Sequence, residues 1–262
     1  MNASIASASV GITPATGSAD TGLSFIEFLE TRLVASPPPT KGQRTRERLK
    51  IAAAKVLEQK GYHGLRIVDV TEAAGVAEGS FYVYFRDKTD ATLAVLTTLL
   101  EDFFSVNLSS EGSDGPFDTI RRANRRWLAI CRSNSGLMRC MLQVGDEDAT
   151  FAQLTRSINQ RWYQRIAASV LRRFPKGAID EKSVLLVAYM LGAMMDDIAR
   201  KLFIYPDEGL LDLLKSAGAD DVAVADVASV LWMRQLYPGL PIDRDLPEIA
   251  NAIVNWPGTA AA

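Results

Sequence analysis

The sequence predicts an all-α protein, and three observations support this fold class. Apolar residues recur at helical spacing from residue 45 onward, whereas the strict alternation that is typical of strands is absent. Helix-capping residues and helix-ending glycines separate these periodic segments. The chain has 262 residues, 48% of them apolar, which suffices for about two domains with a sizeable core. We therefore expect a small N-terminal helical domain followed by a larger one.

Residues 1–40 stand apart from the rest of the chain in composition. Residues 1–22 consist mostly of small and hydroxyl residues with almost no charge, so we expect them to be disordered or extended. A short amphipathic helix is predicted over 23–34 by four apolar residues at helical spacing, Leu23, Ile26, Leu29 and Leu33. The prolines at 37–39 end this helix and act as a stiff spacer.

Four helices are expected between residues 45 and 107. Residues 41–90, which contain the first three of them, are expected to form the N-terminal domain. Gly75 separates two short helices, and Asp87 caps the longest one. The expected helices run from the N-cap Thr45 to Gly61 and Gly64, from about 67 to 74, from about 78 to 84, and from 88 to 107.

The segment 91–240 is expected to be a second helical domain, and 241–262 a C-terminal tail. Pro116 suits the first turn of a helix that contains Trp127. The helix from about 181 to 203 is apolar nearly all round, so we expect it to pack against its own domain and against a partner. A further helix over 222–236 completes the prediction.

The charge distribution restricts the classes of function. The formal net charge is -2, but basic residues dominate between Lys41 and Arg66, where only Glu47 and Glu58 oppose them. Such local basic charge fits nucleic-acid contact at one end of the molecule. The chain has two cysteines and one histidine, His63, with no C-x-x-C pair, so we expect no disulfide framework, metal site or cofactor.

Enzyme and membrane functions are not expected. The sequence has no Ser/His/Asp or Cys/His arrangement and no glycine-rich phosphate loop. Its N-terminus lacks the charged and apolar regions of a secretory signal. The longest apolar run, residues 184–195, is too short to span a bilayer. We therefore expect a soluble, cytoplasmic protein.

Residues 70–88 have the pattern of a helix-turn-helix. Two short helices joined by the tight turn at Gly75 have the geometry of a DNA reader. We expect Val76 and Phe81 to fill the wedge between the helices and Phe85 to anchor the end of the second. The predicted DNA-facing surface consists of Glu78, Gly79, Ser80, Tyr82, Val83, Tyr84 and Lys88, with Arg44, Arg46 and Arg66 as further basic contacts.

These residues resemble the DNA-binding domain of the TetR family. The resemblance rests on four blocks at the family's spacing, namely Gly61-Tyr62, residues 70–76, residues 79–85 and Lys88. It covers about a quarter of the chain. It implies a transcriptional regulator that binds double-stranded DNA at a palindromic operator as a homodimer. It also implies an inducer pocket in the C-terminal domain, usually with repression relieved when the ligand binds.

Three positions depart from the family pattern. Leu65-Arg66 stands where threonine is frequent, Ala77 replaces the usual serine N-cap, and Glu78 follows it. A carboxylate at this position can accept a hydrogen bond from cytosine N4, or it can weaken binding through phosphate repulsion. Glu78 therefore leaves an alternative open, in which a helical dimer acts through protein partners with weakened DNA reading.

The effector pocket and the dimer interface are predicted from apolar helices. Soft methionines and flat aromatic rings suit an adaptable pocket for an apolar or aromatic effector, although the same residues could be plain core. The candidates are Asn124, Trp127, Met138, Met141, Trp162, Tyr163, Tyr189, Met190 and Met194. We expect a four-helix dimer interface from 181–203 and 222–236 of both subunits. The arginines between 121 and 132 are expected to be a solvated helix face, with a second DNA contact as the alternative.

Overall fold

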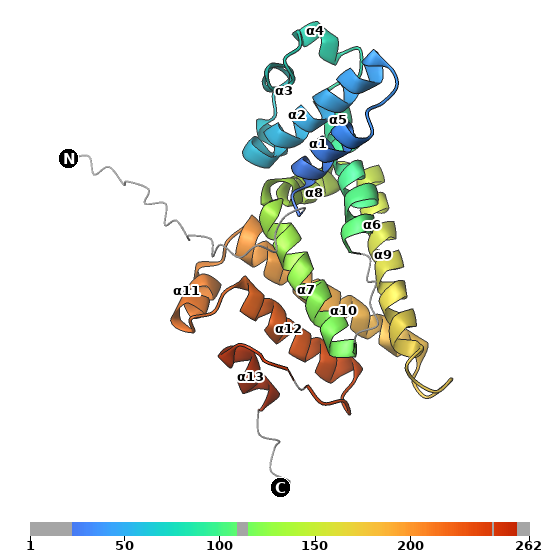
Figure 1. The fold of residues 1–262 in the computed structure, drawn as a ribbon, viewed down its shortest axis with the longest axis vertical. Coiled ribbons are helices and arrows are strands. Elements are labelled where there is room, and N and C mark those ends of the chain that lie inside the picture. The colour runs from blue at the N-terminus through green and yellow to red at the C-terminus, as the bar shows by residue number, and fades with distance from the viewer. Residues whose placement is uncertain (1–22, 109–114, 243, 256–262) are drawn as a thin grey trace, which may run out of the picture.

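The computed structural model describes residues 23–108, 115–242 and 244–255, and these residues form helices and connecting loops without a strand (Figure 1). The N-terminal helices gather at one end of the molecule, and the remaining helices form a larger body below them. The predicted all-α fold is confirmed. The expectation of disorder falls on residues 1–22, which lie outside the described part of the chain.

The N-terminal group comprises α1 to α4. The bounds are Phe25–Ala35 for α1, Lys41–Gly64 for α2, Ile67–Ala74 for α3 and Glu78–Phe81 for α4. The connecting helix follows as α5 (Lys88–Thr98), a π-helical turn η1 (Leu99–Phe103) and α6 (Phe104–Asn107). Together these three segments occupy the predicted span of 88–107.

Eight further segments complete the described fold. They are α7 (Pro116–Ser133), α8 (Ser135–Glu147), α9 (Ala149–Leu171), α10 (Glu181–Ala199), the π-helical η2 (Arg200–Ile204), α11 (Glu208–Ser216), α12 (Asp221–Leu236) and α13 (Glu248–Val254). The segment expected to be a tail thus contains a helix. Ala250 of α13 is fully buried, and α13 packs on α12.

Two predicted helix starts can be compared with the structure. Ser24 caps α1 one residue after the expected start, and Leu23, Phe25 and Leu29 are buried, so this helix docks on the body of the protein. The prediction that α2 starts at Thr45 is wrong, because Thr40 forms a capping box with Gln43 directly after the spacer prolines, five residues before the expected cap.

The reader region follows the predicted order with one difference in length. Gly75 ends α3 with a left-handed backbone, φ 64° and ψ 43°, as the helix-turn-helix requires. The second helix was expected over 78–84, but α4 is a single turn that ends at Phe81. The amide of Tyr84 then donates to the carbonyl of Phe81, which closes a tight turn. Ala77 supplies no side-chain cap, so a short, uncapped α4 is physically reasonable.

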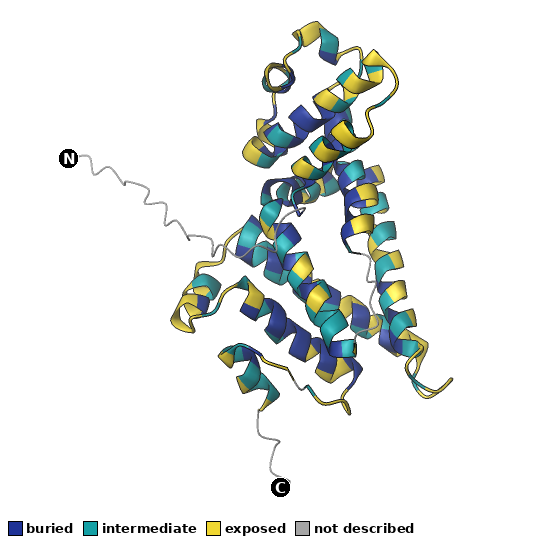
Figure 2. Cartoon of the chain, viewed as in Figure 1, coloured by how far each residue is buried: buried dark blue, intermediate teal, exposed yellow. Residues whose placement is uncertain are grey.

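The core of the larger body is centred on α7 and α12. Figure 2 shows α12 as mostly buried between its neighbours. Asp226 of α12 is fully buried and accepts paired hydrogen bonds from Arg121 and Arg125 of α7. Arg132 likewise pairs with Asp221. The expectation of a solvated arginine face is therefore wrong for Arg121 and Arg125, because a buried acid on a distant helix pairs with them, whereas Arg122, Arg126 and Arg132 are exposed.

No helix within the described residues is both long and apolar enough to cross a membrane.

Candidate nucleic-acid interface

The helix-turn-helix is held together by a small aromatic core. Val70 and Phe81 are fully buried, Phe85 is 2% exposed, and the rings of Phe81 and Phe85 lie 5.6 Å apart. Val76 packs partly against this core. The predicted roles of Val76, Phe81 and Phe85 in packing are thus confirmed. This core fixes α4 against α3 at the tip of the molecule (Figure 1).

The outer surface of α4 and the following turn makes few contacts with the rest of the chain. Glu78 and Gly79 are exposed, Tyr82 is 56% exposed and Val83 is 74% exposed. A Cβ atom added at Gly79 would have no neighbour within 4 Å, so no contact within the chain requires glycine there. A small residue on an open surface allows a partner's backbone to approach closely.

Two predicted reader residues are less exposed than expected. Ser80 is half-buried, and Tyr84 is half-buried against the core. The hydroxyl of Tyr84 lies beside Gly42 at the start of α2. The prediction that Tyr84 is a free surface residue is corrected, because the short α4 turns this side chain back toward α2.

The predicted basic residues lie around this surface, and several are held by their own neighbours. Arg44 donates to the carbonyl oxygens of Pro38 and Pro39 at 2.9 and 3.0 Å. The guanidinium of Arg46 lies 5.0 Å from the centre of the Phe85 ring, and the ammonium of Lys88 lies 5.2 Å from that of Tyr62. Arg66 is exposed immediately before α3. These contacts orient the side chains without neutralising their charge.

Arg48 belongs to the same basic helix start as Arg44 and Arg46, but its contact with the reader was not predicted from the sequence. Its Nη2 donates to the carbonyl oxygen of Ala74 at 2.6 Å, directly before the turn glycine. This bond ties the helix-turn-helix to α2 and satisfies a carbonyl that the end of α3 leaves free. The two residues are 26 positions apart, and no local pattern signals such a contact.

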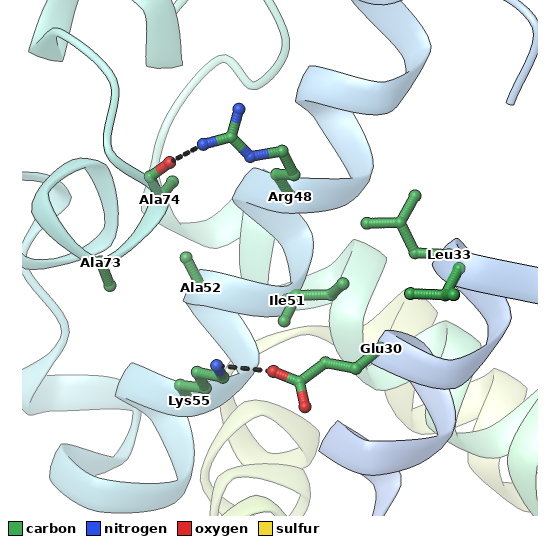
Figure 3. Close-up of a pocket in the computed structure, with 9 residues that line it drawn as sticks. Glu30, Leu33, Arg48, Ile51, Ala52, Lys55, Ala73 and Ala74 are labelled. Atoms are coloured by element: carbon green, nitrogen blue, oxygen red, sulfur yellow. Dashed lines mark hydrogen bonds and ion pairs between the residues drawn. The ribbon is translucent and has the colours of Figure 1, made fainter. Parts of the chain in front are cut away.

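A cleft of about 260 Å³ lies beside the reader, between α1, α2 and α3 (Figure 3). Ile51 and Ala52 of α2 line it, and Leu33 contributes an apolar side chain from α1. Lys55 and Glu30 form an ion pair of 2.6 Å from one side of the cleft to the other.

The predicted pocket residues do not all converge. Asn124 is buried and donates to the hydroxyl of Ser229 at 3.0 Å, so it joins α7 to α12. Met190 is 66% exposed on α10, so its assignment to an enclosed pocket is corrected. Met138 is buried, whereas Trp127, Met141, Trp162 and Met194 are half-buried. Within the described residues the indole nitrogen of Trp127 is buried without a hydrogen-bond partner.

The rings of Tyr163 and Tyr189, two candidate pocket residues, pack together with centroids 4.3 Å apart. Tyr163 also packs so tightly on Gly192 of α10 that a Cβ atom there would lie 2.2 Å from its ring. Nearby, desolvation by the surrounding helices raises the pKa of Asp196 to about 6, although part of the residue is exposed. Burial, followed by the Asp196 charge, raises the pKa of Tyr163 to about 12.

A three-helix unit with a left-handed glycine turn and an exposed second helix defines a helix-turn-helix DNA-binding protein. The family model described as bacterial regulatory proteins, tetR family, matches residues 51–95, which span this unit. Residues 51–95 are therefore similar to the helix-turn-helix DNA-binding domain of TetR-family regulators.

Individual relatives agree with this assignment. The transcriptional regulator EthR of Mycolicibacterium smegmatis is 23% identical over 200 residues, which cover 72% of this chain and 85% of that protein. A transcriptional regulator from a Rhodococcus strain has a similar fold, with a TM-score of 0.58, 19% identity and coverage of 72% and 96%. The Bacillus subtilis regulator FadR in complex with stearoyl-CoA has a TM-score of 0.51 at 15% identity, with coverage of 74% and 98%.

Proposed function

We propose that this chain is a ligand-responsive repressor that binds a palindromic operator as a homodimer. The observation that carries the proposal is the surface of α4 and its turn, where Glu78, Gly79, Tyr82 and Val83 are exposed on a rigid aromatic core. Hydroxyl and small side chains at this position can reach phosphates and base edges. Basic residues around the surface supply the sequence-independent attraction.

The proposed DNA contacts can be tested on the full chain. A palindrome enriched from random sequence should bind with a log affinity that falls linearly with log salt. Tyr82→Ala should weaken operator binding about tenfold, because each good contact is worth roughly 1–3 kcal/mol. Arg161→Ala, an exposed arginine on the distant α9, is the matched control and should leave affinity unchanged. Failure to enrich any palindrome would overturn DNA reading.

A homodimer is supported by an apolar surface on α10 and α12. Leu186 and Met190 are 62% and 66% exposed, and Tyr189 and Leu231 are exposed as well. Exposed apolar residues on two neighbouring helices suit an isologous four-helix interface. Met190→Glu should therefore produce monomers in sedimentation velocity. Leu213→Glu, an equally exposed apolar site on α11, is the control and should not.

The effector is proposed to be largely apolar, with at least one hydrogen-bond acceptor. The half-buried rings and methionines of α7 to α10 supply apolar surface, and the unpaired indole N–H of Trp127 supplies a donor. Long-chain acyl compounds are a suitable first screen, since FadR, which shares the fold, is bound to stearoyl-CoA. A saturating effector that leaves operator affinity unchanged would contradict this mechanism.

The alternative of a dimer that works through protein partners rests on Glu78. This exposed carboxylate lies in the first turn of an uncapped four-residue helix. Glu78→Gln separates base reading by this carboxylate from phosphate repulsion, and only repulsion, which weakens DNA reading, favours the alternative. Base reading by Glu78 predicts a changed base preference at one operator position. Simple repulsion predicts tighter binding with the same preference.

A further inference from the structure

Helix α1 precedes the matched family segment and contacts several distant parts of the fold. Its first residues are anchored by Asn134, which is 1% exposed at the turn between α7 and α8. The Asn134 amide donates to the carbonyls of Leu23 and Ile130 and accepts from the amide of Phe25, each at 2.8 Å. A buried side chain with its hydrogen bonds satisfied on three sides is a specific attachment.

The middle of α1 packs on the connecting helix. Phe25 and Phe28 both contact the ring of Phe103, with centroids 5.6 and 5.4 Å away in edge-on geometry. Arg32 lies over the Phe28 ring and forms an ion pair with Asp102. Both Asp102 and Phe103 belong to η1, so α1 holds the π-helical turn of the connecting helix.

The outer side of α1 faces α2 of the DNA-binding domain. Glu30 pairs with Lys55 at 2.6 Å across the cleft, as Figure 3 shows. Leu33 lines the same cleft opposite Ala73 and Ala74 of α3. One short helix therefore contacts the reader domain, the connecting helix and the first turn of the regulatory helices.

Helix α1 attaches to the connecting helix at the π-helical turn η1. The π-helical turn Leu99–Phe103 interrupts the helix that joins the two domains, and π-helical turns frequently occur at functional positions. A helix that changes its hydrogen-bond pattern can shift its two halves relative to one another. Because α1 contacts both η1 and α2, its docking fixes the geometry on both sides of this turn.

We propose that α1 is an interdomain clasp that fixes the reader relative to the regulatory domain, and that its release lowers operator affinity. The clasp rests on the proposed DNA-binding function. Asn134, Phe103 and Asp102 act as positioning residues, because they hold α1 and lie outside the reader surface. The inference extends the function of the chain to a segment that lies N-terminal to the helix-turn-helix.

The test uses the full chain with Phe28→Ala and Arg32→Asp combined. Hydrogen exchange should show lost protection in α1 and η1 but unchanged protection in α12. Operator affinity should fall about 3- to 30-fold, the range of couplings carried by residues outside a binding site. Adding Asp102→Arg restores the ion pair with reversed charges and should recover part of both effects. Glu30→Gln removes only the ion pair with α2 and leaves the contacts with η1, so it should lower operator affinity less than the combined variant does.

An independent readout separates this proposal from DNA binding. Spin labels at Glu72→Cys and Ala168→Cys lie on exposed sites of α3 and α9, and both native cysteines are fully buried. The distance distribution, measured in dimers diluted with unlabelled chain, should broaden in the combined variant. Unchanged protection of α1, an unchanged distribution, or unchanged operator affinity with α1 released would each overturn the clasp. An absence of operator binding in the unmodified chain would overturn only the proposed function.

Discussion

Two arginine-rich helices of this protein look alike in sequence but differ in their surroundings. Arg44 and Arg46 at the start of α2 are exposed; within the described part of the chain Arg44 donates to backbone carbonyls and Arg46 lies over an aromatic ring. Arg121 and Arg125 of α7 are directed at Asp226, a fully buried carboxylate. The charges of Arg44 and Arg46 therefore remain available to a binding partner. The charges of the two α7 arginines are instead paired with Asp226 within the fold.

The position of the acidic residues therefore decides the role of the arginines. No carboxylate pairs with Arg44 or Arg46 among the interactions recorded for them, while Asp226 lies 101 and 105 positions away from its two arginines. The spacing of charges within one helix could not reveal which arginines pair with an acidic residue on a distant helix. Four measurements test the distinction between the two groups of arginines and the contacts around them.

The largest effect is expected from Asp226→Asn. This change removes the charge that two arginines share, and breaking a buried ion pair typically costs about 3–5 kcal/mol. Urea unfolding of the full chain measures the loss. Asp118→Asn is the matched control because its pair with Arg244 is exposed, and it should cost about 1 kcal/mol or less. Equal losses in the two variants would contradict the importance of burial.

The joint between the domains is expected to respond next most strongly. A Cβ atom at Gly136 would lie 2.0 Å from the carbonyl oxygen of Glu58, so Gly136→Ala must push α8 away from α2. We expect a loss of about 1–3 kcal/mol in the free energy of unfolding. Gly145→Ala on the same helix meets no atom within 4 Å and should instead stabilise the protein by up to about 1 kcal/mol. Similar signs for both variants would argue against the close approach.

Arg46→Ala and Arg125→Ala should separate DNA binding from stability. Loss of one phosphate contact at Arg46 should reduce the slope of log affinity against log salt by about one, with little change in unfolding. Arg125→Ala should lower stability and leave the salt slope unchanged. Fluorescence anisotropy and thermal unfolding measure the two quantities. A reduced salt slope for Arg125→Ala together with a stability loss for Arg46→Ala would contradict the roles assigned to α2 and α7.

The smallest effect is a difference in pH dependence between two aspartates. Burial raises the pKa of Asp226, but the hydrogen bonds from Arg121 and Arg125 outweigh burial, so its pKa is lowered. Its contribution to stability is present above about pH 4 and is lost as the pH falls through the folded pKa.

Asp196 should behave in the opposite way. Although part of the residue is exposed, desolvation of its carboxyl group raises its pKa to about 6, so the folded state binds the proton more tightly than the unfolded state does. Its effect is therefore a loss of stability as the pH rises from about 4 through 6. Asp196→Asn should be more stable than the unmodified chain at pH 7 and equal to it below pH 4. Parallel pH profiles for the two proteins would contradict this assignment.

The sequence predicted the parts of the fold that depend on local patterns. The order of the helices, the turn at Gly75 and the Asp87 cap follow from periodicity and backbone preference. The start of α2 was missed because the capping box at Thr40 lies behind three prolines that suggested a spacer. The length of α4 was overestimated because the apolar spacing of Phe81 and Phe85 fits both a helix and a tight turn.

Contacts between distant residues could not be predicted in the same way. Arg48 bonds to a backbone carbonyl, and any residue type supplies such an acceptor. Asn124 sits beside an apolar stripe, a position that suits a ligand contact as well as its actual bond to Ser229. Met190 fits the helical period of α10, but periodicity does not tell which side of a nearly all-apolar helix is covered.

The carboxylate of Glu58 accepts from the amides of Gly136 and Leu137, each at 2.9 Å, while Arg46 lies twelve residues earlier on the same helix. Twelve residues correspond to about 18 Å and about three and a third turns of α-helix. Insertion of one residue between these positions would rotate the arginine by about 100° around the helix axis relative to the joint. A chimera that exchanges the N-terminal domain must therefore conserve this residue count, since helical phase as well as length is transmitted along α2.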